Sequence, residues 1–148
     1  MRSCLPLLLA FAACEGRSPP AWTTKTGFLE RGLFSGRRFC GSGTTDVDAR
    51  RELAKVLQRF SVALAGQEGM LAHQLHDELG KVVSFEHIAA RWTSPDGSSQ
   101  RALAALTLEE AGAAIEAFPW IAPAARAQLQ SRLRPAFDEL ALQGRLDD

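Results

Sequence analysis

The chain has 148 residues, 17 basic and 17 acidic side chains and a formal net charge of zero, and its length suits one small domain. This net charge of zero is the sum of two parts with opposite charge. Residues 1–45 carry six Lys and Arg and two acidic residues, whereas residues 46–148 carry 11 Lys and Arg and 15 acidic residues. The acidic balance of the second part argues against nucleic acid as the main partner. A basic leader before an acidic body is typical of a targeting or disordered segment, 1–45, followed by a folded domain, 46–148.

Residues 1–14 begin with a single charge and continue as an apolar run that suits a signal peptide and is too short to cross a bilayer. Two interpretations of the leader are open. The favoured one is an organelle transit peptide, mitochondrial or plastid, in which Arg37-Arg38-Phe39-Cys40 resembles a matrix-protease site. The alternative is a bacterial envelope lipoprotein, in which Phe11-Ala12-Ala13-Cys14 is a lipobox and lipidated Cys14 is the link to the membrane. In both we expect the leader to add nothing to the fold.

From residue 46 the apolar residues recur at helical spacing. Thr45 or Asp46 can cap a helix that runs to about Gly66. A second helix is expected over 68–82, and Ser84 can cap a short third one that carries Phe85, Ile88 and Trp92. The expected core stripe of the first helix is Leu53, Val56, Leu57, Phe60 and Leu64, and that of the second is Leu71, Leu75, Leu79 and Val82.

Residues 93–99 form the clearest loop, because they contain Pro95 and Gly97. Thr107 and Glu110 have the spacing of a capping box, which begins a helix that ends near Phe118. Pro123 suits the first turn of a last helix, and Pro135 is expected to kink that helix or to end its first half. Strand signals are nearly absent, so the sequence predicts an all-α fold, a small bundle of four to five helices. Residues 41–148 contain no Cys, so packing must stabilise it.

The one concentration of reactive side chains in the body is His73, His76 and Asp77. Their spacing puts them on the solvent side of the second helix, where two imidazoles and a carboxylate can converge on a metal ion. His87 is the candidate fourth ligand. The alternative is an ordinary helical pair between His73 and Asp77.

Residues 68–81, Glu-Gly-Met-Leu-Ala-His-Gln-Leu-His-Asp-Glu-Leu-Gly-Lys, resemble the phosphoacceptor box of one class of two-component sensor histidine kinases. The resemblance implies that His76 is the phosphorylated imidazole and Asp77 its adjacent acid. Gln74 stands where that family has Glu, and His73 where it usually has Arg. The chemistry needs an exposed histidine whose ring nitrogen attacks a phosphoryl group.

Large aromatic side chains stand at the expected helix ends, namely Trp92, Phe118 and Trp120. They either plug the ends of the bundle or form an apolar patch for a partner. The favoured function is a small helical interaction or accessory-subunit protein in an organelle, with no catalysis of its own, no cofactor and a protein partner or larger complex.

Overall fold

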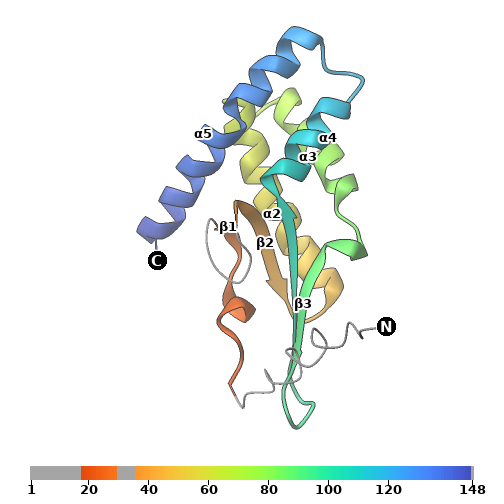
Figure 1. The fold of residues 1–148 in the computed structure, drawn as a ribbon, viewed down its shortest axis with the longest axis vertical. Coiled ribbons are helices and arrows are strands. Elements are labelled where there is room, and N and C mark those ends of the chain that lie inside the picture. The colour runs from red at the N-terminus through yellow and green to blue at the C-terminus, as the bar shows by residue number, and fades with distance from the viewer. Residues whose placement is uncertain (1–17, 30–35, 148) are drawn as a thin grey trace, which may run out of the picture.

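The computed structural model describes residues 18–29 and 36–147, and this part of the chain has an α+β fold (Figure 1). It combines helices with a four-stranded antiparallel sheet, so the predicted all-α helical bundle is wrong. The strands are β1 (Gly27–Leu29), β2 (Arg38–Gly43), β3 (Ile88–Thr93) and β4 (Gln100–Thr107), in the order β1-β2-β4-β3. β1 and β2 belong to the segment that we expected to add nothing to the fold, and β3 replaces most of the expected short helix after Ser84.

The helices are α2 (Asp46–Ala65), α3 (Met70–Val82), α4 (Leu108–Ala117) and α5 (Pro123–Asp147), with short 3₁₀ turns η1 (Ala21–Thr24) and η2 (Phe85–His87). The four longer helices match the predicted ones closely. Thr45 caps α2 by accepting a hydrogen bond from the backbone N–H of Asp48 at 3.1 Å. The predicted loop over 93–99 is also confirmed, because it connects β3 to β4 as a hairpin. α5 continues through Pro135 as one helix.

α2 packs directly on β2 because the facing strand residues have no side chain. A Cβ atom on Gly41 would lie 2.1 Å from the backbone nitrogen of Leu53, and one on Gly43 would lie 2.6 Å from that of Ala49. Beside this contact, four rings from different elements pack together, with the half-buried Phe28 at the edge of the core. Phe39 of β2 lies within 4.7–5.8 Å, between ring centroids, of Phe28, Phe60 and Phe137. The fold is therefore organised around β2.

The opposite face of the sheet has a smaller apolar cluster of its own. Cys40, Leu103 and Ala105 are buried there, and Trp22 from η1 packs on them. Burial raises the pKa of the Cys40 thiol to about 11, with the nearby Arg38 charge opposing the shift. The Cys40 thiol is therefore protonated at neutral pH. Trp22, which precedes β1 in the chain, packs on this face of the sheet.

None of the helices in the described ranges combines the length and apolarity that a membrane span requires.

The predicted capping box of α4 is confirmed and gives the first testable prediction. The Thr107 hydroxyl accepts from the Glu110 N–H at 3.0 Å, and the Glu110 carboxylate accepts from the Thr107 N–H at 2.7 Å. Because Thr107→Ala leaves a first-turn amide without its acceptor, we expect it to lower the free energy of unfolding by about 1 kcal/mol in urea denaturation. Thr93→Ala is the control, since Thr93 is exposed at the end of β3. Equal losses in both variants would contradict a capping role.

Candidate functional site

The connection between α4 and α5 presents a tryptophan at the surface. Trp120 is 39% exposed, and its ring stacks on that of Phe118 with centroids 5.9 Å apart and an interplanar angle of 15°. Phe118 and Ile121 are buried. Arg126 of α5 donates from Nη2 to the carbonyl oxygens of Phe118 at 3.1 Å and Ile121 at 2.9 Å. These contacts fix the connection, so Trp120 is held in place although it is exposed.

A cavity of about 310 Å³ lies between Trp120 and one side of α3. Its other lining residues are polar, namely Gln74, Asp77, Glu78 and Lys81. Lys81 donates to the Glu78 carboxylate at 2.8 Å, and this hydrogen bond raises the pKa of Lys81. We call Trp120 with these four residues the Trp120 surface. It combines one aromatic ring with charges of both signs.

Leu71 extends this side of α3, contrary to its predicted place in the core. It is 39% exposed, whereas Ala72, Leu75 and Leu79 are buried. At 100° per residue these three define a buried face that is rotated away from Leu71, which leaves Leu71 on the same side as Gln74. Val82 is half-buried at the edge of the core. The apolar stripe on α3 is thus narrower than its leucine spacing predicts.

The predicted histidine patch lies on α3 as a loose set of contacts. His73 Nε2 is 3.4 Å from Asp77 Oδ2, and His76 Nδ1 is 3.8 Å from Asp77 Oδ1. The side chain of His73 is 75% exposed and that of His76 is 28% exposed. Both histidines also line a cavity of about 220 Å³ beside the start of α3, together with Glu68. The phosphoacceptor role of His76 stays a prediction.

The predicted fourth metal ligand, His87, has other partners. Its Nδ1 accepts from the backbone N–H of Ser84 at 3.0 Å, and its Nε2 lies 3.8 Å from Glu110 Oε1. His87 thereby completes a capping box for η2. Across residues 18–29 and 36–147, no three His, Cys, Asp or Glu side chains are grouped so that they could hold a metal ion.

Trp92, the third predicted partner residue, is separated from the other two. It lies in β3 opposite Arg101 of β4, near the loop of the hairpin, and is half-buried. Figure 1 shows this hairpin loop and the α4–α5 connection at opposite ends of the molecule. The structure therefore brings Phe118 and Trp120 together and leaves Trp92 outside their surface.

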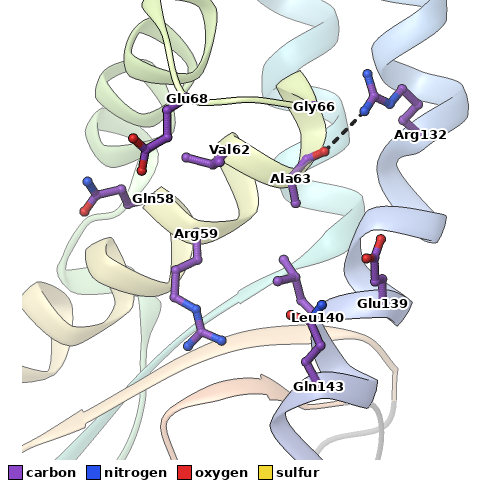
Figure 2. A pocket seen from close by; sticks show the side chains of 10 residues that line it. All are labelled: Gln58, Arg59, Val62, Ala63, Gly66, Glu68, Arg132, Glu139, Leu140 and Gln143. Carbon is purple, nitrogen blue, oxygen red and sulfur yellow. Dashed lines mark hydrogen bonds between the residues drawn. The ribbon is translucent and has the colours of Figure 1, made fainter.

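Another cavity, of about 580 Å³, lies between α2 and α5 (Figure 2). Two arginines line it, and each has a contact within the protein. Arg132 reaches from α5 to the carbonyl oxygen of Ala63 at 3.3 Å, and the Arg59 guanidinium lies 5.3 Å from the centroid of the Phe28 ring. Glu68 and Glu139 also line this cavity. Because charges of both signs line this cavity, they favour neither an anionic nor a cationic ligand. The two arginines instead connect α2 to α5 and to β1.

The residues predicted for processing lie in very different places. Phe39 and Cys40 are 0% and 1% exposed in β2, which has β1 on one side and β4 on the other. Arg37, just before β2, donates from Nε to the Asp138 carboxylate of α5 at 2.6 Å. Cys14 lies outside the described residues.

Sequence reasoning identified Phe118, Trp120 and Asp77 but missed Gln74, Glu78 and Lys81 as parts of one surface with Trp120. Helical spacing places Gln74, Glu78 and Lys81 on one side of α3, and this signal was present in the sequence. No local pattern links that side to Trp120, because the two segments meet only through the packing of α3 near the end of α4.

We compared the chain with protein-family models, curated proteins and solved structures, and none of them matches it.

Proposed function

We propose that this protein is an interaction protein that binds another protein through the Trp120 surface. The observation that carries the proposal is an exposed indole held in place by Phe118 and Arg126. Tryptophan is enriched among the residues that dominate binding energy, because a rigid ring buries a large area at little entropic cost. Leu71 adds apolar area on the same side of α3, and the charged groups around the ring supply a polar rim.

The proposal predicts that Trp120 is an anchor of the interface. A photo-crosslinking amino acid at position 120 in the native cell should give one discrete adduct, whose partner mass spectrometry identifies. With the purified partner, Trp120→Ala should weaken binding about 30-fold or more, the effect of an anchor worth about 2 kcal/mol. Since Trp120 is only 39% exposed and its ring stacks on Phe118, this variant should also lose some stability. Its thermal unfolding midpoint is measured to show that it stays folded at the assay temperature.

Phe85→Ala is the matched control for that experiment. Phe85 is an exposed aromatic at 61%, in η2, and its ring contacts Arg50 at 4.3 Å. Its removal should leave the affinity for the partner unchanged. Equal affinities for the wild type and the Trp120→Ala variant would contradict the proposed interface.

The burial of Phe39 and Cys40 also supports a proposal about delivery, namely the lipoprotein alternative. A cut between these residues would remove η1, β1 and the first two residues of β2. Processing that preserves the fold must instead lie before Trp22, which packs on the cluster that contains Cys40. The lipobox Phe11-Ala12-Ala13-Cys14 meets this condition. We therefore favour a bacterial envelope lipoprotein, anchored through Cys14, over an organelle protein cut at Cys40.

Lipidation predicts that Cys14→Ser abolishes the membrane attachment of the full-length chain in a bacterial host. The measurements are metabolic labelling with an alkyne fatty acid, membrane fractionation and the mass of the mature N-terminal peptide. Cys4→Ser is the control, because Cys4 lies inside the apolar run before the lipobox and should leave the labelling intact. A mature chain that begins at Cys40 would overturn the proposal.

A further inference from the structure

We infer that the Trp120 surface binds the guanidinium group of an arginine side chain on the partner protein. The inference rests on the proposed function and adds the chemistry of the contact. It is carried by the indole, the cavity that the indole borders and the Asp77 carboxylate that lines the same cavity.

The indole supplies a face for a cation. The Trp120 ring is stacked on Phe118 at an interplanar angle of 15° and also borders the cavity toward α3. The π face of tryptophan is the most favourable aromatic site for a cation in proteins. Because the Phe118 ring and the Arg126 hydrogen bonds already fix the connection, binding does not need to order it.

Asp77 supplies the counter-charge. The two carboxylates of the cavity differ, since Glu78 already accepts from the Lys81 ammonium at 2.8 Å. The side chain of Asp77 is 52% exposed and lies 3.4 Å from the His73 imidazole and 3.8 Å from that of His76. The Lys81 ammonium also acts on Asp77 as a nearby charge, but its hydrogen bond goes to Glu78. An incoming cation can therefore pair with Asp77 without displacing Lys81.

The chemistry of the lining groups favours arginine over lysine. A guanidinium is planar, so it can stack on the indole and donate two parallel hydrogen bonds to a carboxylate, whereas an ammonium is a compact and strongly hydrated charge. Gln74 offers an amide oxygen in the same cavity for a further donor. A cavity of about 310 Å³ has room for one such side chain.

The test is an NMR titration of the ¹⁵N-labelled full-length protein with N-acetyl-arginine amide, following the three tryptophan indole N–H resonances. The resonance of Trp120, assigned from a Trp120→Phe variant, should shift saturably, while those of Trp22 and Trp92 stay in place. N-acetyl-citrulline amide, a neutral isostere, and N-acetyl-lysine amide should bind more weakly. Asp77→Asn should reduce the affinity about tenfold, as expected for loss of a charge-assisted hydrogen bond.

Glu52→Gln is the matched control, since Glu52 is a carboxylate paired with Lys55 on α2, and it should leave the titration unchanged. A Trp120 resonance that does not move, or that moves equally with the citrulline amide, overturns the arginine inference. The proposed interface would still stand after that result if Trp120→Ala lowered the affinity for the partner protein while Asp77→Asn did not. Loss of the arginine shift in the Asp77→Asn variant together with weaker partner binding would support both.

Discussion

Replacing Gly41 by alanine is expected to cost the domain about 3 kcal/mol of unfolding free energy or more, at or beyond the upper end of the range for overpacked cores. The added Cβ would lie 2.1 Å from the Leu53 nitrogen, 2.5 Å from the Ala49 oxygen and 2.7 Å from the Glu52 carbonyl carbon. All three are backbone atoms of α2, so no change of rotamer relieves the overlap. Relief requires α2 to move off the sheet, and α2 carries the apolar residues that fill the core between it and β4.

Gly80→Ala is the control with the same chemical change in an open position. Gly80 lies within α3, and a Cβ there would have no heavy atom within 4 Å. Alanine in a helix interior is more favourable than glycine by roughly 0.5–1 kcal/mol, so this variant should be slightly more stable than the wild type. Urea denaturation followed by circular dichroism measures both. Similar midpoints for the two variants would mean that α2 does not pack on β2 as closely as described.

The same close packing explains why the helices were predictable and the sheet was not. The helices carry local signals that do not depend on the rest of the fold, such as the Thr45 cap and the Thr107–Glu110 capping box. The faces of β2 and β4 that meet α2 include several small residues, Gly41, Ala102 and Ala104 among them. Glycine and alanine are depleted in strands, and a run of alanine and leucine such as 102–106 has the composition of a helix. Their position under α2, which no local window contains, makes them strand residues.

The candidate site divides in a similar way. That Phe118 and Trp120 stand at a helix end near a proline follows from the sequence, and so does the polar side of α3. That these two parts of the chain form one surface depends on how α3 packs near α4. The sequence places Trp92 in the same group only because it is also an aromatic residue near the end of an expected helix. A pattern in one segment can show that a side chain is exposed, but it cannot show which distant segment lies beside it.

A chain that begins at Cys40 is expected not to fold, whereas one that begins at Ser18 is expected to fold like the full-length protein. The shorter chain lacks the buried Phe39 and the half-buried Phe28, two of the four rings that pack together. Loss of one buried phenylalanine side chain costs about 3–5 kcal/mol, and the whole stability of a domain is about 5–15 kcal/mol.

Further losses in the chain from Cys40 add to these two rings. It lacks β1, so β2 becomes an edge strand, and it lacks Trp22, which packs on the cluster of Cys40 and Leu103. The ion pair between Arg37 and Asp138 is also removed. Far-ultraviolet circular dichroism and thermal unfolding of the two purified chains measure the outcome, with a cooperative transition expected only for the chain from Ser18. A cooperative transition in the chain from Cys40 would show that the fold tolerates processing at that position. The organelle interpretation would then be restored, because its protease site would release a stable domain.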